Sequence, residues 1–232
     1  MRKTKKGELF RSTLIVVPAF NEEPRVGAVV LAIVAHGFDV VVIDDGSTDN
    51  TSGEARSAGA RVVSHPFNLG QGASLRTGFD YAELGEWTYV VSFDADGQHD
   101  LSNAIAMLDK AATGNYDVVL GSRFLQGARS NAPMTRSLVL RVATKAINVI
   151  FRSRFTDVNN GLRVFRVDAI KKMSLSQNRM AHASEMLSEI KKRNLSWTDM
   201  PTDITYSSVT LDKGEKTISG SVKILWEVLM RP

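Results

Sequence analysis

Three short runs of aliphatic and β-branched residues constrain the fold more than any other feature of this sequence. They cover Thr13 to Val17, Val40 to Ile43 and Tyr89 to Phe93. Each run is almost continuously apolar rather than alternating, which is typical of strands buried on both faces of a parallel sheet. Segments with helical spacing lie between the runs. The sequence therefore predicts an α/β fold.

The segments around these runs complete the expected framework. We expect helices over residues 25–36, 51–58, 73–83 and 101–112, and weaker strands over 61–64 and 118–121. Asp100 or Ser102 is a suitable cap for the fourth helix. A further helix over 136–151 places Arg136, Arg141 and Lys145 on or beside its apolar stripe. That helix is either an ordinary amphipathic surface helix or one whose cations face a membrane or a phosphate.

The expected domain organisation is simple. We predict a basic tail over residues 1–11, one domain over 12–216 and an amphipathic helix over 217–232 that contacts a membrane surface or a partner. No uncharged stretch approaches the roughly 18 to 20 apolar residues that cross a bilayer. Pro18 and the acidic pair at 22–23 interrupt the only segment that imitates a signal peptide. We therefore expect neither a spanning helix nor a secretion signal.

The amino-acid composition limits the kinds of metal site and partner that this chain can have. The 232 residues include no cysteine, which excludes disulfides, thiolate zinc sites and cysteine nucleophiles. Any metal must therefore bind oxygen or imidazole ligands. The formal net charge of +4 favours a phosphate-bearing partner. Charge alone does not distinguish nucleic acid, anionic lipid and a phosphorylated substrate.

Acidic residues follow two of the expected strands directly. One cluster runs from Asp44 to Asp49, and the other contains Asp94, Asp96 and Gln98. Ligands of an open parallel sheet bind outside the carboxyl ends of its strands, so both clusters should face one crevice. Their mutual repulsion would be relieved by Mg²⁺ or Mn²⁺, which suit oxygen ligands combined with substrate phosphates. For Asp49 and Asn50 we favour a capping role, because Thr51 opens a helix.

Several motifs resemble family 2 glycosyltransferases of the GT-A fold, and in particular the branch of dolichyl-phosphate mannose synthase and related polyprenyl-phosphate enzymes. The motifs occur over about residues 12–210 in the order and spacing of that family. They are Pro18-Ala19-Phe20-Asn21-Glu22, Asp44-Asp45-Gly46-Ser47-Thr48-Asp49, Asn68-Leu69-Gly70-Gln71-Gly72 with Arg76, Asp94-x-Asp96-x-Gln98, Gly121-Ser122-Arg123, and Asp157 with Gly161-Leu162-Arg163-Val164-Phe165.

The resemblance implies a mostly parallel GT-A sheet flanked by helices, and a UDP- or GDP-sugar as donor. Residues implied at the nucleotide are Pro18, Phe20, Glu22, Asp45, Arg76 and Asp94. Asp96 and Gln98 would hold the metal, with Asp94 beside the ribose or the water shell of the metal. The metal would stabilise charge on the departing nucleoside diphosphate. For Arg76, a role on the helix surface is an equal alternative.

The same resemblance implies a polyprenyl-phosphate acceptor. Arg123 and Arg136 stand where the family binds the acceptor phosphate, and the planar guanidinium suits a phosphate dianion. Arg163 is a further candidate for binding the acceptor phosphate. An ion pair between Arg123 and a site carboxylate is the structural alternative. Leu140 departs from the family, which carries a hydroxyl near this position in its mannose synthases.

Asp157 has a role that depends on the acceptor. A phosphate monoester is already ionised, so Asp157 would orient the acceptor or Arg163, and attack on the anomeric carbon with inversion would need mainly positioning. A sugar hydroxyl would instead make Asp157 the leading candidate for general base. A turn or cap before Asn159 is the bland alternative.

Two further groups are weaker candidates. His182 and Glu185 share a face of an expected helix, and Glu185 is implied at the acceptor site. Lys213 and Lys216 stand where relatives carry a mobile basic loop that closes over the donor diphosphate, although solvated lysines are at least as compatible with the sequence.

The expected function is therefore metal-dependent, inverting sugar transfer to a polyprenyl phosphate at the cytoplasmic face of the membrane. We expect peripheral attachment through a basic face and the C-terminal segments, helped by a small membrane subunit. Alternatives are a transferase that uses a saccharide hydroxyl in cell-surface polysaccharide assembly, and a basic nucleic-acid-binding module. The second lacks any recognisable motif. A sugar-nucleotide pyrophosphorylase would need a Gly-rich basic loop after the first strand, and residues 18–23 have none.

Overall fold

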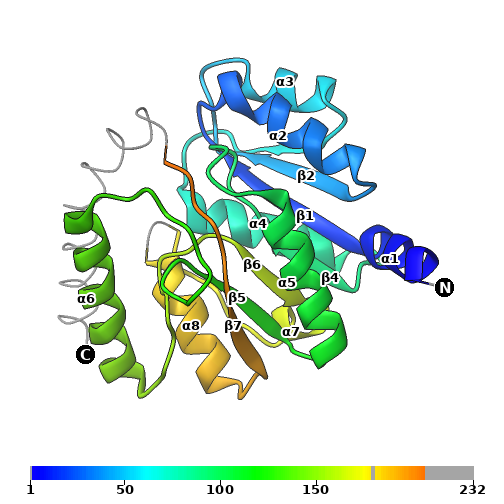
Figure 1. The fold of residues 1–232 in the computed structure, drawn as a ribbon. Helices are drawn as coiled ribbons and strands as arrows, with labels where there is room; N and C mark the ends of the chain where they lie inside the picture. The colour runs from blue at the N-terminus through cyan, green and yellow to red at the C-terminus, as the bar shows by residue number, and fades with distance from the viewer. Residues whose placement is uncertain (1, 179–180, 207–232) are drawn as a thin grey trace.

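The computed structural model describes residues 2–178 and 181–206, which form a central sheet with helices on both faces (Figure 1). The strands are β1 (Thr13–Ala19), β2 (Asp39–Asp44), β3 (Arg61–Ser64), β4 (Tyr89–Ser92), β5 (Val118–Ser122), β6 (Arg163–Arg166) and β7 (Trp197–Pro201). Their order across the sheet is β3-β2-β1-β4-β6-β5-β7. Among the strands of the described residues, only β6 is antiparallel to its neighbours, which are β4 and β5. The predicted mostly parallel α/β class is confirmed.

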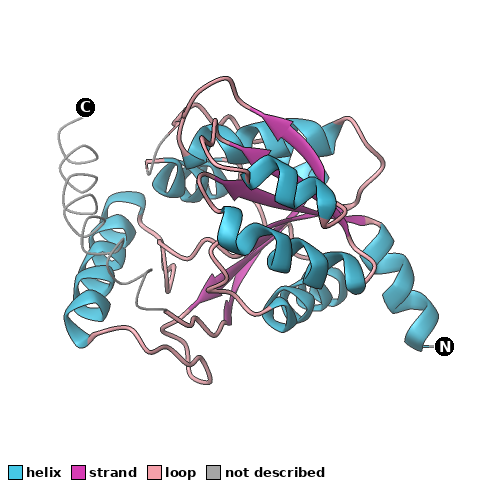
Figure 2. Cartoon of the chain, turned by 90° about the horizontal axis from the view of Figure 1, so that it is seen from above, coloured by secondary structure: helices cyan, strands magenta, loops and turns pink. Residues whose placement is uncertain are grey.

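The helices divide between the two faces of the sheet. They are α1 (Arg2–Arg11), α2 (Glu23–Ala35), α3 (Thr51–Ser57), α4 (Gln71–Glu83), α5 (Leu101–Gly114), α6 (Met134–Phe151), α7 (Val167–Ile170) and α8 (His182–Lys192). Apolar side chains of α2, α3 and α5 pack on one face, and those of α4, α7 and α8 on the other. Figure 2 shows the same arrangement from above, with α6 standing apart from the sheet.

The near-continuous apolar runs are buried because both sheet faces are covered. In β1, Ile15 and Val17 belong to the core under α2 and α5, whereas Leu14 and Val16 belong to the core under α4. Alternate side chains of a strand point to opposite faces, so each face needs its own apolar set. The burial of both sets confirms the prediction that these runs are strands buried on both faces of a parallel sheet. It also fixes the register in which the carboxyl ends of β1, β2 and β4 lie side by side.

Several segments depart from the expected framework, and the short elements α7 and β7 were among those that no pattern predicted. Residues 2–11 form helix α1 where the sequence suggested a tail, and the rings of Phe10 and Phe38 lie 4.3 Å apart between their centroids. Strand β6 was not anticipated, because its sequence Arg-Val-Phe-Arg has a charged residue at each end. The expected helix over 217–232 lies outside the described residues. Among the described helices, none has both the length and the apolar character needed for a membrane crossing.

Helix α4 approaches β1 so closely that one helical glycine has no room for a side chain. A Cβ atom on Gly78 would lie 2.2 Å from Cγ1 of the buried Val16. We predict that Gly78→Ala lowers the free energy of unfolding by about 1–3 kcal/mol, the usual cost of overpacking. Chemical denaturation measures this change.

Gly27 in α2 is the matched control. Its added Cβ would meet Glu54 at an ordinary 3.6 Å. Gly27→Ala should leave stability unchanged or raise it by up to about 1 kcal/mol, because alanine favours the helix. Equal destabilisation by the two substitutions would contradict the close α4–β1 contact.

Candidate active site

The candidate site is a pocket of about 450 Å³ at the carboxyl edge of the parallel strands, which is the size range of small-molecule sites. Loops after β1, β2, β4 and β5 contribute to it, together with the loop before β6 and the starts of α4, α6 and α8. Its lining includes Pro18, Phe20, Glu22, Asp45, Asp94, Asp96, Gln98, Arg123, Arg136 and Arg163. The structure therefore brings these ten predicted residues, and the weaker candidate His182, to one cavity.

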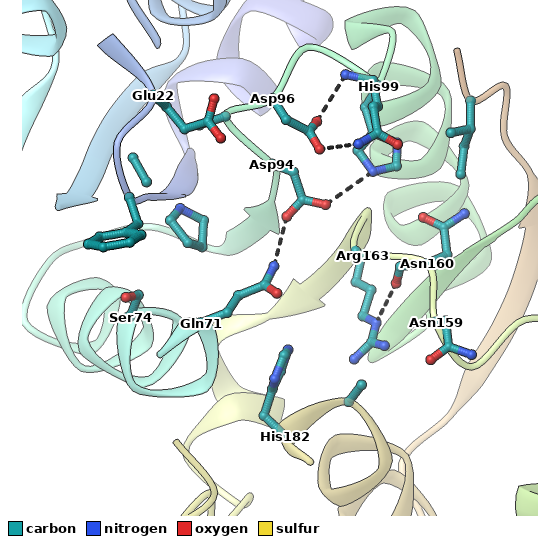
Figure 3. A pocket seen from close by; sticks show the side chains of 18 of the residues that line it. Glu22, Gln71, Ser74, Asp94, Asp96, His99, Asn159, Asn160, Arg163 and His182 are labelled. Carbon is teal, nitrogen blue, oxygen red and sulfur yellow. Dashed lines mark hydrogen bonds and ion pairs between the residues drawn. The ribbon is translucent and has the colours of Figure 1, made fainter. Parts of the chain in front are cut away.

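The loop after β4 places two carboxylates side by side in the pocket (Figure 3). Asp96 accepts hydrogen bonds from the backbone N–H of Gln98, at 3.0 Å, and from the side-chain amide of Gln98. Burial, and next the negative charge of Asp94, raise the pKa of Asp96 above its ordinary value. A positive charge placed between the two carboxylates would remove this penalty.

Asp94 is held from three sides. Its Oδ1 accepts from Nε2 of Gln71 at 3.0 Å, and its Oδ2 lies 3.4 Å from Nε2 of His99. A Cβ atom on Gly161 would stand 2.3 Å from the same Oδ2. Burial alone would raise the pKa of Asp94, but the hydrogen bond and charge of His99, with the charge of His182, hold it below the ordinary value. Asp94 is therefore an ionised carboxylate with a fixed position.

Three of the side chains expected at the nucleotide lie at or just after the end of β1. Pro18 and Phe20 line the pocket, and the Phe20 ring is 42% exposed, so it offers a face for stacking. Glu22 accepts from Nε of Arg25 at 2.7 Å. Asp49 accepts from the N–H of Thr51, which confirms its part of the capping prediction, whereas Asn50 stands at the N-cap of α3 without a side-chain capping hydrogen bond.

Asp45 ties the loop after β3 to the end of β2. Its Oδ1 accepts from Nδ1 of His65 at 2.8 Å and from the N–H of Leu69 at 2.9 Å. Its Oδ2 accepts from the N–H of Gly70 at 2.7 Å. This carboxylate borders the pocket, but it also fixes the turn from which α4 starts. Recognition of a base by Asp45 stays a prediction.

Arg123 forms a buried ion pair, the structural alternative raised by the sequence. Its Nε donates to Oδ2 of Asp157 at 2.6 Å, and its Nη1 donates to the Tyr206 hydroxyl at 2.7 Å. Burial alone would lower the pKa of Arg123, but the Asp157 charge and Tyr206 raise it above the ordinary value. Arg123 nevertheless lines the pocket, so it can pair with Asp157 and face a ligand at once.

Two more arginines border the pocket. The Arg136 guanidinium lies 4.4 Å from the centroid of the Tyr206 ring. Arg163 is 4% exposed and donates to the carbonyl oxygens of Asn160, at 3.0 Å, and Val158, at 3.1 Å. Burial lowers the pKa of Arg163 to about 10, so it remains a cation at neutral pH.

Three predicted residues lie outside the pocket lining. The Asp157 side chain has no exposed surface, and its Oδ1 accepts from the N–H of Asn159 at 3.1 Å. Glu185 accepts from the N–H groups of Ser176 and Gln177, each at 2.9 Å, so it holds the loop before α8. Arg76 donates to the carbonyl of Ser176 at 3.4 Å on the surface of α4. Lys213 and Lys216 lie outside the described residues.

The pocket also contains residues that sequence reasoning missed. These are Gln71, Ser74, His99, Asn159, Asn160 and Tyr206. The Ser74 hydroxyl and the Asn159 amide nitrogen are buried and find no partner among the described residues, so they are available to a ligand. Gln71 lies within the motif at 68–72, and His99 directly follows the motif at 94–98, so their positions could have indicated a place in the site. Tyr206 gave none.

The residues present fit a divalent metal bound together with phosphates. Within residues 2–178 and 181–206, no group of three His, Cys, Asp or Glu side chains is arranged to hold a metal alone. Mg²⁺ commonly binds through only one or two carboxylates, and substrate phosphates and water complete its shell. Asp96 and the neighbouring Asp94 would supply these one or two carboxylates. The repulsion between the two negative charges favours a cation at this place.

Comparison with known proteins agrees with this geometry. A sequence model of glycosyl transferase family 2 matches residues 14–174. Uncharacterized protein MJ1222 of Methanocaldococcus jannaschii is 33% identical over 97% of this chain and 93% of its own length. A second relative is the UDP-N-acetylglucosamine–dolichyl-phosphate N-acetylglucosaminyltransferase of Methanococcus voltae. It is 28% identical over 93% of this chain and 94% of its own length.

The fold recurs in a solved enzyme. Glucosyl-3-phosphoglycerate synthase from Mycobacterium tuberculosis, in complex with Mn²⁺, UDP and glucosyl-3-phosphoglycerate, superposes with a TM-score of 0.71. The match covers 96% of this chain and 83% of that chain at 18% identity. At this identity the likeness establishes the GT-A fold.

Because Gly161 makes room for Asp94, Gly161→Ala should displace that carboxylate and leave the sheet intact. We predict that the variant unfolds at nearly the wild-type temperature and loses most of the stabilisation that Mn²⁺ with UDP or GDP gives the wild type. Thermal shift with and without these ligands measures both. Gly27→Ala is the control that keeps the ligand response. Wild-type stabilisation of Gly161→Ala by the ligands would show that the position of Asp94 is not needed.

Proposed function

The chain belongs to glycosyl transferase family 2 and is a nucleotide-sugar-dependent glycosyltransferase, and from that premise we propose that it transfers a sugar from a UDP- or GDP-sugar to a polyprenyl phosphate. The transfer inverts the anomeric carbon and releases a nucleoside diphosphate. One observation carries the proposal. The lining of a single pocket includes two neighbouring carboxylates, Asp94 and Asp96, here called the acidic end, and two arginines that both contact Tyr206, Arg123 and Arg136, here called the basic end.

The acidic end suits the donor. Asp96 and Asp94 would hold Mg²⁺ or Mn²⁺, which supplies the positive charge that stabilises the departing diphosphate. Phe20 and Pro18 border the space for the base, and Gly70 and Gln71 at the start of α4 line the same pocket. The same residues serve either uracil or guanine, so the donor is proposed as a class.

The basic end suits a phosphate acceptor. Arginine binds phosphate through parallel N–H groups, and both Arg123 and Arg136 border the pocket. The phosphate oxygen of the acceptor is already ionised near neutral pH. Its attack on the anomeric carbon therefore needs alignment rather than proton removal, and the arginines supply that alignment.

Asp157 favours this acceptor over a saccharide hydroxyl. A hydroxyl would need a base that can reach it, and Asp157 was the leading candidate. Its side chain is fully buried, with one oxygen held by Arg123 and the other by the N–H of Asn159. Asp157 is thus placed to orient Arg123. The Methanococcus voltae relative is named for transfer to dolichyl phosphate, which agrees with a lipid phosphate acceptor.

Helix α6 supports the further proposal of peripheral attachment at the cytoplasmic face of a membrane. Its large apolar side chains at 134, 138, 142 and 149 are 89%, 64%, 54% and 78% exposed. Arg141 and Lys145 lie exposed on the same helix. An apolar stripe bordered by cations is the composition that binds an anionic lipid surface. A small membrane subunit is a second candidate for this surface.

The acceptor assignment is tested by product analysis. We predict that purified protein with a UDP- or GDP-sugar, Mn²⁺ and farnesyl phosphate yields a sugar-phosphate-farnesyl diester in mass spectra, and that farnesol yields none. Arg136→Ala should raise the KM for farnesyl phosphate about 10- to 100-fold, the usual loss for a charge-assisted contact. Arg129→Ala alters an exposed arginine in the loop before α6, outside the pocket lining, and it should act like wild type. Product formed on a saccharide alone would contradict the assignment.

The membrane assignment is tested by vesicle sedimentation. Leu138→Asp combined with Val142→Asp should lower binding to vesicles that contain phosphatidylglycerol by about tenfold or more, because each substitution removes an exposed apolar side chain that the lipid would bury and adds a negative charge. Leu84→Asp alters a residue that is 88% exposed on another helix end, and it should leave binding unchanged. Equal binding of all three proteins would contradict attachment through α6.

A further inference from the structure

Tyr206 connects the two arginines of the basic end. Its hydroxyl accepts from Nη1 of Arg123 at 2.7 Å, and its ring lies 4.4 Å below the Arg136 guanidinium. The side chain is 5% exposed and borders the pocket. No motif in the sequence singled out this tyrosine for a role at the acceptor.

The backbone around Tyr206 is fixed on two sides. Its N–H donates to Oδ1 of Asn131 at 2.7 Å, and its carbonyl accepts from Nδ2 of the same asparagine at 2.9 Å. Asn131 lies just before α6, the helix that carries Arg136. One residue earlier, the N–H of Thr205 donates to the carbonyl of Gln98 at 3.1 Å. Residues 205 and 206 are therefore tied to the loop after β4 and to the residues just before α6.

Two guanidinium groups that converge on one phosphate repel each other before the phosphate arrives. The buried Asp157 balances Arg123, but no salt bridge within the described part of the chain involves Arg136. An aromatic face attracts a guanidinium without using its N–H donors, and a phenol oxygen accepts from the second one. Tyr206 can therefore hold both cations in place and leave donors of Arg136 for a ligand.

We propose that Tyr206 is a positioning residue that holds Arg123 and Arg136 as one two-arginine site for the acceptor phosphate. This inference rests on the acceptor class proposed above. It predicts that changes at Tyr206 act on phosphate binding, whereas nucleotide binding at the other end of the pocket is unaffected.

The test is calorimetric titration of three proteins with farnesyl phosphate, and separately with Mn²⁺ and UDP or GDP. Tyr206→Phe keeps the ring under Arg136 and removes the oxygen next to Arg123, and it should weaken farnesyl phosphate binding about 3- to 10-fold. Tyr206→Leu removes both contacts and should weaken it about 10- to 100-fold. Binding of the nucleotide with Mn²⁺ should equal wild type in both variants.

Tyr89→Phe is the matched control. Tyr89 is also 5% exposed, its hydroxyl accepts from Arg166 at 3.4 Å, and the Arg166 guanidinium lies 5.5 Å from its ring, outside the pocket lining. This variant should bind both ligands like wild type.

The outcomes separate the two levels of the proposal. If wild type does not bind farnesyl phosphate, the acceptor assignment fails, and this inference fails with it. If wild type binds it and Tyr206→Phe binds equally well, the acceptor stands and the role of Tyr206 is overturned. Equal weakening of nucleotide and phosphate binding would also overturn it, because that pattern indicates general disruption. Should Tyr206→Leu fail to fold, Tyr206→Phe alone decides.

Discussion

The reversed strand β6 is the constraint on which the site depends. It pairs antiparallel with β4 and β5, with Ser92 and Leu120 both opposite Arg163. The loop that precedes β6 therefore lies at the edge of the sheet where β4 and β5 end. That loop brings Gly161 against Asp94 and Asp157 against Arg123. One antiparallel strand thus joins the acidic and the basic ends of the pocket.

The two ends keep their charge because each is balanced locally. Asp94 is held by Gln71 and His99, and Arg123 by the buried Asp157. Direct pairing of carboxylates with arginines across the pocket would have cancelled the attraction for both a metal diphosphate and a phosphate. Local partners instead fix the side chains, and the carboxylates and the arginines still line the cavity. This arrangement fits a reaction in which one phosphate group leaves while another attacks.

The sequence predicted the parts of the molecule that local patterns determine. The strands β1, β2 and β4 are nearly continuous apolar runs. The acidic residues that follow them lie at one edge of the sheet, because the carboxyl ends of parallel strands lie together. Strand β6 has arginine at each end, and β7 contains only five residues with an acid among them, so neither shows a clear period. The partner of Arg123 is 34 residues away, and Tyr206 is 83 residues away. Such contacts arise from the tertiary fold and leave no local trace.

The account depends most on the division of one pocket into a metal-diphosphate end and an acceptor-phosphate end. Anomalous diffraction from crystals grown with Mn²⁺, UDP or GDP, and farnesyl phosphate tests it directly. We expect a manganese peak beside the Asp96 carboxylate and the farnesyl phosphorus between the guanidinium groups of Arg123 and Arg136. Manganese bound away from the loop after β4, or the lipid phosphate bound outside the two arginines, would contradict the account.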